Sequence, residues 1–134
     1  MDLRNVTRAG GLYDLLVTGA FATPWSARWL LGSLAHLPLG GATLPAFDEG
    51  QLLFVVLLGT LVTLWSILRV VAPARPLLLV DTVGRVLFAT WMLRAVRLGA
   101  PRATLVFAAL EIVWALVQGW ALWRGTPSSA AHAA

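Results

Sequence analysis

Three stretches of this chain are mostly apolar over about 20 residues or more, enough for a helix to cross a hydrocarbon core of roughly 30 Å. They cover residues 51–71, 76–98 and 102–123. Pro73 and Pro101 lie in the connections between them, and these connections are short. We therefore predict three transmembrane helices that pack antiparallel as sequential neighbours.

The composition agrees with a membrane protein. Hydrophobic residues make up 59% of the chain and charged residues 12%, whereas soluble domains carry roughly 25% charged residues. The chain has no cysteine, which excludes disulfides, thiolate metal sites and cysteine redox chemistry. Every cation is an arginine, and arginines at helix ends contact lipid phosphates. We expect an integral protein of a bacterial inner membrane, surrounded by lipids, with no nucleic-acid partner.

The N-terminal part contains a shorter apolar segment, residues 10–22, and Pro24 follows it closely. Two interpretations are open. A single kinked helix would run from about residue 8 to residue 36. Alternatively, a first span covers about residues 8–23 and a second helix begins at Pro24, since proline is tolerated in the first turn of a helix.

The residues after Pro24 favour the second interpretation. Trp25 and Trp29 lie four residues apart, as in an amphipathic helix that aromatic side chains anchor at the membrane interface. We place this interfacial helix at about 25–37 and an extramembrane loop at 38–50. The predicted fold is an all-α four-helix transmembrane bundle with a short amphipathic interfacial helix after the first span.

The bundle forms one domain, residues 1–124, and residues 125–134 are a flexible tail. Four spans place both termini on one side of the membrane. The arginines expected on that side are Arg4, Arg8, Arg69, Arg75 and Arg124. Those expected on the other side are Arg28, Arg94, Arg97 and Arg102. Because cytoplasmic loops carry the excess of positive charge, five against four favours cytoplasmic termini.

Four charged residues lie inside the apolar stretches: Asp14, Asp81, Arg85 and Glu111. A charge at membrane depth costs about 2.5 kcal/mol or more, so it faces the protein interior or water. Such residues mark a functional site by default. Buried ion pairs also hold helices in register without any chemistry, and this structural interpretation stays open beside the functional one.

Spacing and depth predict that these charges meet. Asp81 and Arg85 are four residues apart and share one helix face. Arg85 and Glu111 are each about ten residues from the start of their spans, near the midplane of a span of about 20 residues. The predicted pocket has seven members: Tyr13, Asp14, Asp81, Arg85, Glu111, Trp114 and Gln118. In it, the Tyr13 hydroxyl completes the polar cluster and Trp114 lines a space for a flat apolar ligand.

Three carboxylates and one guanidinium would give the predicted pocket a net charge of −2 in a low-dielectric environment. Arginine stays protonated, so we expect at least one carboxylic acid to hold a proton, through desolvation and like-charge repulsion. An acid of this kind suits proton relay, general acid–base work or the binding of a polar head group. In this interpretation Arg85 holds an anionic or carbonyl group, while Glu111 or Asp14 exchanges a proton.

No other motif predicts chemistry. His36 is the only histidine outside the tail, and no second ligand is spaced to form a metal site with it. There is also no Gly-rich phosphate loop, and no serine, threonine or tyrosine is paired with a histidine. We predict neither a metal nor a cofactor, and the chain leaves open whether it is an enzyme.

Several residues together resemble a known group of proteins. They are Tyr13-Asp14 followed by Pro24-Trp25, then Asp81-x-x-x-Arg85, then Glu111. In these positions and in its hydropathy the chain resembles the DoxX-like small four-helix membrane proteins. The resemblance implies a four-helix membrane fold and a link to quinone or thiol redox chemistry. The chain has no cysteine, so a direct thiol role does not fit it.

The sequence thus predicts a small integral membrane protein with an intramembrane pocket of acids and arginine. The pocket would bind a lipid-like or quinone-like small molecule or relay protons. The alternative is a non-catalytic accessory subunit that packs against a larger membrane protein complex. A homo-oligomer acting as a small transporter is also open.

Overall fold

The computed structural model describes residues 2–35 and 47–124, and within these ranges the chain is all helical, without strands. Its elements are α1 (Leu3–Thr18), the 3-10 helix η1 (Gly19–Ala22), α2 (Pro24–Ala35), α3 (Glu49–Val71), α4 (Arg75–Arg97) and α5 (Thr104–Arg124). The predicted all-α class is confirmed for these residues. The predicted tail and most of the predicted loop 38–50 lie outside them, as do the last two residues of the interfacial helix.

Helices α3, α4 and α5 coincide with the three predicted apolar stretches, apart from one or two residues at their ends. A capping box starts α3: the Gln51 backbone N–H donates to the Asp48 carboxylate (2.7 Å), and the Asp48 N–H donates to the Gln51 side chain (3.1 Å). Past the end of α4, Gly99 adopts φ +103°, a conformation that favours glycine. All three helices are long and apolar enough to cross a membrane.

Helix α1 begins at Leu3, earlier than the predicted start near residue 8. The Asp2 carboxylate accepts a hydrogen bond from the Arg4 backbone N–H (3.1 Å) and so caps the first turn. Helix α1 has 16 residues and η1 adds four more.

The helical conformation is interrupted after η1. Thr23 is extended, with φ −132° and ψ 151°, because a residue that precedes proline avoids the helical region. Helix α2 then begins at Pro24. The single kinked helix from residue 8 to residue 36 is therefore wrong, and the start of a separate helix at Pro24 is confirmed.

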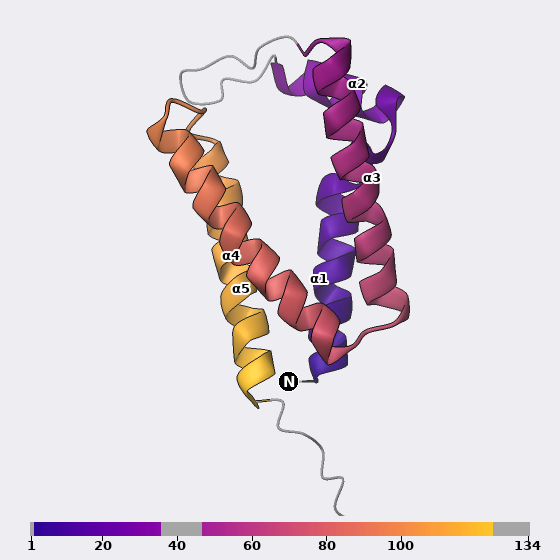
Figure 1. Cartoon of the computed structure of the whole chain (residues 1–134), viewed down its shortest axis with the longest axis vertical. Coiled ribbons are helices and arrows are strands. Elements are labelled where there is room, and N and C mark those ends of the chain that lie inside the picture. Colours follow the sequence, from indigo (N-terminus) through magenta and orange to yellow (C-terminus); the bar gives the residue numbers. More distant parts are fainter. Residues whose placement is uncertain (1, 36–46, 125–134) are drawn as a thin grey trace, which may run out of the picture.

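The four longer helices form two pairs arranged as a V (Figure 1). Helix α3 packs along α1, and α5 packs along α4. The pairs meet at the end of the molecule where α1 begins and α5 ends, and they diverge towards α2. Helices α3 and α4 are consecutive but do not pack along their lengths, so the predicted packing of sequential neighbours is wrong for this pair.

Two glycines explain why α3 pairs with the N-terminal segment. A Cβ atom on Gly11 would lie 2.8 Å from the carbonyl oxygen of Ser66, and one on Gly59 would lie 2.3 Å from that of Phe21. Neither site has room for a side chain. Small residues allow helices to approach closely, and here they bring α3 against α1 and η1.

The closed end of the V is sealed by apolar side chains from α1, α4 and α5. Val6, Leu78 and Ala121 are buried there, and partly buried apolar residues pack around them. This small core joins the two helix pairs below the level of the charged residues.

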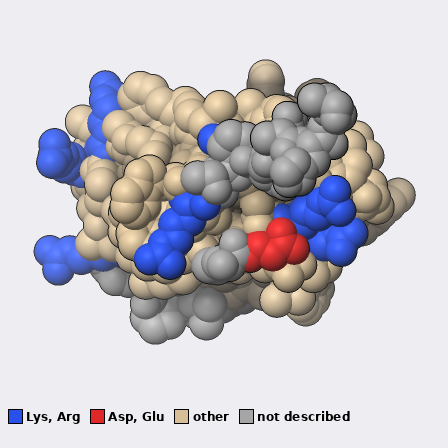
Figure 2. All heavy atoms as spheres, turned by 90° about the horizontal axis from the view of Figure 1, so that it is seen from below, with Lys and Arg blue, Asp and Glu red and all other residues tan. Residues whose placement is uncertain are grey.

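Exposed arginines lie at both ends of the helices. At the closed end they are Arg4, Arg8, Arg75 and Arg124. At the open end they are Arg28, Arg94, Arg97 and Arg102. Figure 2 looks onto the closed end, where arginines are spread over the face and a red acidic patch lies beside them. Arg69, which was counted with the closed-end group, is completely buried. The count becomes four against four, so the argument for cytoplasmic termini loses its basis.

Candidate functional site

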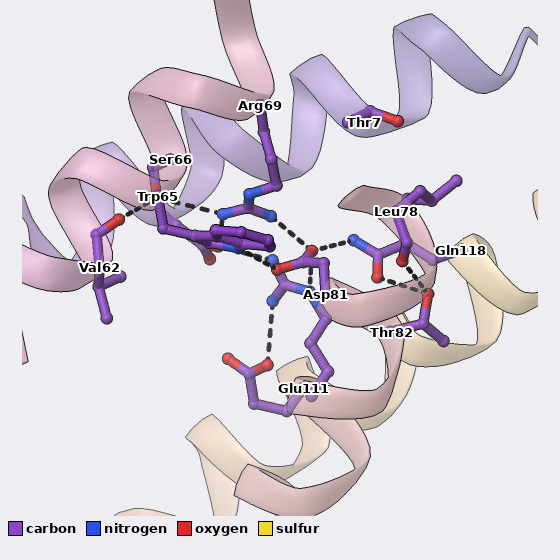
Figure 3. A network of polar contacts seen from close by, with 12 residues as sticks. Thr7, Val62, Trp65, Ser66, Arg69, Leu78, Asp81, Thr82, Glu111 and Gln118 are labelled. Atoms are coloured by element: carbon purple, nitrogen blue, oxygen red, sulfur yellow. Dashed lines mark hydrogen bonds and ion pairs between the residues drawn. The ribbon is translucent and has the colours of Figure 1, made fainter. Parts of the chain in front are cut away.

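A network of charged and polar side chains joins the two helix pairs near the closed end of the V (Figure 3). Helices α1, α3, α4 and α5 all contribute to it. The members that we call the polar network are Asp14, Trp65, Ser66, Arg69, Asp81, Thr82, Arg85, Glu111 and Gln118. Asp14, Asp81, Arg85, Glu111 and Gln118 were predicted to meet, and the structure brings them together.

Asp81 is the centre of the network and accepts four hydrogen bonds. Its Oδ2 accepts from Arg69 Nη1, from Arg85 Nε (3.2 Å) and from Gln118 Nε2 (2.6 Å). Its Oδ1 accepts from the indole N–H of Trp65 (3.2 Å). Asp81 is buried, and a buried carboxylate is tolerated only when cations and donors compensate its charge. The two arginines and the two neutral donors together compensate the buried Asp81 carboxylate.

Arg85 bridges the acids of three helices. Its Nη2 donates to Asp14 (2.8 Å), its Nη1 to Glu111 (2.9 Å) and its Nε to Asp81. The aromatic rings of Tyr13 and Trp114 flank the guanidinium, with ring centroids 5.7 Å and 5.5 Å from Cζ, a distance suited to cation–π attraction.

The roles of these two aromatic residues differ from the prediction. Tyr13 contacts Arg85 through its ring, and among the hydrogen bonds of the described residues there is none from the Tyr13 hydroxyl. Trp114 packs on Tyr13 and Arg85 and is not part of the cavity wall described below.

Arg69 is the main residue that the sequence analysis missed. Its Nη2 donates to Asp14 and to the Ser66 hydroxyl (3.1 Å), and its Nη1 donates to Asp81. Its side chain is completely buried. Arg69 therefore pairs with two of the three acids and belongs to the interior, although it was assigned to the helix end.

The direction of helical side chains explains this error. Arg69 lies in the last turn of α3, and long side chains on a helix point back towards its N-terminus. The guanidinium therefore reaches inward to the depth of the acids. Residues 59, 63, 66 and 69 follow one another at offsets of four, three and three, so extending the small and polar stripe of α3 by one step would have found Arg69.

The second arginine changes the charge of the site. Asp14, Asp81 and Glu111 contribute three negative charges, and Arg69 and Arg85 contribute two positive ones, so the net formal charge is 2 − 3 = −1. The sequence analysis counted −2 because it lacked Arg69. One proton or one external cation is enough to neutralise the network.

A cavity of about 430 Å³ lies between the two helix pairs. Asp14, Asp81, Arg85 and Glu111 contribute to its wall, whereas Gln118 does not. Most other wall residues lie one or two turns nearer the open end of the V and are apolar, among them Leu61, Phe88, Met92 and Phe107. The cavity is thus a partly open, mostly apolar cleft, and the network forms its charged end.

Asp14 and Glu111 are the acids best placed to bind a molecule in the cavity. Glu111 uses only Oε2 and Asp14 only Oδ2 for the side-chain contacts of the network, so each keeps one carboxylate oxygen without a partner among the described residues. The Asp14 side chain is 13% exposed and the Glu111 side chain 14%. By contrast, Nε and both terminal nitrogens of Arg85 already donate to carboxylates.

Compared with protein families, characterised proteins and solved structures, the chain matches none of them. The resemblance to the DoxX-like proteins therefore stays a prediction. Residues 2–35 and 47–124 contain no group of three or more histidine, aspartate or glutamate side chains suited to a metal ion. The chemistry of the site has to be argued from its own geometry.

Proposed function

We propose that this chain is an integral membrane protein whose cavity binds a lipid-like or quinone-like small molecule beside an acid that exchanges a proton. In this proposal α1 with η1 forms the first of four spans, and α3, α4 and α5 form the others. The apolar side chains on the outer faces of these helices support it. Leu16, Leu58, Val106 and Leu116 are examples that are more than half exposed, which suits contact with lipid.

Helix α2 would lie in the membrane interface. Trp25 and Trp29 are 79% and 72% exposed, and amphipathic tryptophan side chains sit at the level of lipid head groups. Arg28 forms an ion pair with Glu49 at the start of α3. This contact would hold α2 beside the open end of the V.

The observation that carries the proposal is the meeting of an apolar cavity with a charged network at one end. Ligand pockets are mostly apolar, with a few polar groups that fix the orientation of the ligand. A molecule with an apolar body would occupy the space beside Phe88 and Phe107, and its polar head would face Asp14 and Glu111. The role first assigned to Arg85, holding an anionic or carbonyl group, is poorly supported because that guanidinium is already engaged by three acids.

A substitution that fills the cavity tests this proposal. Gly84 lies in the cavity wall, and a Cβ there would meet no atom within 4 Å, so Gly84→Leu should fill the space without disturbing the helices. Gly119→Leu is the matched control, because its Cβ also meets nothing within 4 Å and the residue lies outside the cavity wall. Native mass spectrometry with lipid extraction should find a stoichiometric small molecule on the wild type and on Gly119→Leu that is missing from Gly84→Leu.

The same mass spectrometry experiment distinguishes ligand binding from the alternative functions. If all three proteins carry the same annular lipids and nothing stoichiometric, the binding proposal fails. If a larger membrane protein stays bound in every case, the chain is an accessory subunit. A second copy retained in every case would indicate a homo-oligomer.

A further inference from the structure

We propose that the molecule bound in the cavity is a lipophilic cation, such as an amine or a quaternary ammonium or phosphonium compound, and that it competes with a proton. This inference rests on the proposed function, because it names the chemical class of the ligand of the same cavity. It follows from the charge of the network, from the donors and acceptors that remain free, and from the aromatic wall.

The net charge of the network favours a positive ligand. Three carboxylates face two guanidinium groups, which leaves one negative charge in a place shielded from water. An uncompensated charge in a low-dielectric interior is costly, so the site takes up either a proton or a cation. The cavity gives an external cation access to these acids, because Asp14, Asp81 and Glu111 contribute to its wall.

Glu111 is the acid best placed to bind either the proton or the ligand cation. It is contributed by α5, and among the described residues its carboxylate accepts one hydrogen bond, from Arg85 to Oε2. The other charged or titratable groups near it are Tyr13 and Asp14 from α1 and Asp81 and Arg85 from α4. Arg69 from α3 binds Asp14 and Asp81 and does not contact Glu111. Asp81 is held by four donors, so the negative charge available to a ligand lies on Glu111 and Asp14.

The charges that face the cavity favour a cation over an anion. The Tyr13 hydroxyl is a neutral donor in the wall, and Nε, Nη1 and Nη2 of Arg85 each already donate to an acid. The other arginine, Arg69, is completely buried and is not in the cavity wall. The carboxylate oxygens of Glu111 and Asp14 that lack a partner are acceptors, and they suit an ammonium group or a diffuse positive charge.

The walls of the cavity suit the body of such a molecule. Tyr13, Trp65, Phe88 and Phe107 all contribute to the wall. Aromatic faces attract cations, and more strongly where water is excluded. Apolar substituents around a positive centre would contact Leu61 and Met92. The site thus combines a single negative charge with aromatic and aliphatic surface.

Isothermal titration calorimetry in mild detergent, with tetraphenylphosphonium as the probe, tests the inference. Tetraphenylborate is the control ion, since it has the same shape and the opposite charge. The phosphonium should bind wild-type protein at one site and release a proton to the buffer. Its affinity should weaken as the solution becomes more acidic, because the protonated acid and the bound cation exclude each other.

Variants distinguish this site from partition into detergent. Glu111→Gln brings the network to −1 + 1 = 0 and should weaken phosphonium binding at least about tenfold. Asp14→Asn is a second variant with the same change of charge, should Glu111→Gln fail to fold. Glu49→Gln removes an exposed acid of the distant ion pair with Arg28 and should leave the affinity unchanged. Gly84→Leu should abolish binding.

The outcomes separate this inference from the proposed function. If the borate binds as well as the phosphonium, or if neither binds while the wild type still carries a neutral molecule that Gly84→Leu lacks, the ligand is not a cation and the cavity remains a binding site. If Gly84→Leu differs from the wild type in neither experiment, both proposals fail.

Discussion

At the scale of single residues, the site depends on how two buried arginines share three acids. Removing any one of these five charges changes the net charge of the interior by one. Buried ion pairs stabilise little compared with an apolar alternative of the same shape, but removing one partner leaves an uncompensated charge and is strongly destabilising. Arg69 is the clearest case, since it contacts two acids and is fully buried.

Arg69→Gln should therefore destabilise the protein strongly. The substitution leaves three carboxylates against Arg85 alone, a net charge of −2. Breaking a buried ion pair in this way costs about 3–5 kcal/mol. Unfolding followed by circular dichroism in detergent measures the loss. Arg94→Gln is the control, because Arg94 is exposed in the last turn of α4 and should change the free energy of unfolding by no more than about 0.5 kcal/mol. Equal losses in the two variants would show that Arg69 is not an interior residue.

At the scale of elements, close helix contacts decide which helices pair. Helix α3 approaches η1 at Gly59 and α1 at Gly11, in both cases with backbone atoms where a Cβ would have to lie. Other glycines in the helices, such as Gly84 and Gly119, face open space. A substitution at each kind of position therefore tests whether the first pair of helices depends on close backbone approach.

Gly59→Ala should weaken the packing of η1 on α3. The new Cβ would lie 2.3 Å from the carbonyl oxygen of Phe21, so the backbone has to shift, at a cost of about 1–3 kcal/mol. Gly119→Ala should be neutral or stabilising by up to about 1 kcal/mol, because alanine is the better helix former and has room there. Thermal denaturation of both variants gives the comparison. A Gly59→Ala protein as stable as Gly119→Ala would mean that α3 and η1 are not in close contact.

At the scale of the whole molecule, the V is closed by an apolar core and the polar network, and it opens towards α2. The first pair of helices contributes Asp14 and Arg69, and the second contributes Asp81, Arg85 and Glu111. Each pair contains ion pairs of its own, and two further ion pairs join them: Arg69 with Asp81, and Arg85 with Asp14. The charged contacts therefore hold the two pairs together at the closed end of the cavity.

The proposed four spans predict that both ends of the chain label from the same side of the membrane. The chain has no cysteine, so single substitutions give a clean signal with an impermeant thiol reagent on intact cells or sealed vesicles. Arg4→Cys and Arg124→Cys, at exposed positions of the closed end, should react from one side. Arg102→Cys, exposed at the open end, should react from the other. Labelling of positions 4 and 124 from opposite sides would mean that α1 and η1 do not cross the membrane.

Much of the fold was predictable because its causes are local. Hydropathy and length mark α3, α4 and α5, and Pro24 marks the break before α2. The burial of Asp14, Asp81 and Arg85 was predictable as well, since a charge within an apolar stretch cannot face lipid. Their depth along the spans was enough to predict that they meet.

The helices and the charges inside the apolar stretches could therefore be predicted from the sequence alone, because both follow from the neighbours of each residue along the chain. The three-dimensional fold was needed to show that α3 packs on α1, that Arg69 pairs with Asp14 and Asp81, and that the net charge is −1. These features depend on contacts between residues far apart in sequence, such as Arg69 with Asp14. The cavity depends on the same contacts, because its space is what remains when the two helix pairs meet at one end and diverge at the other.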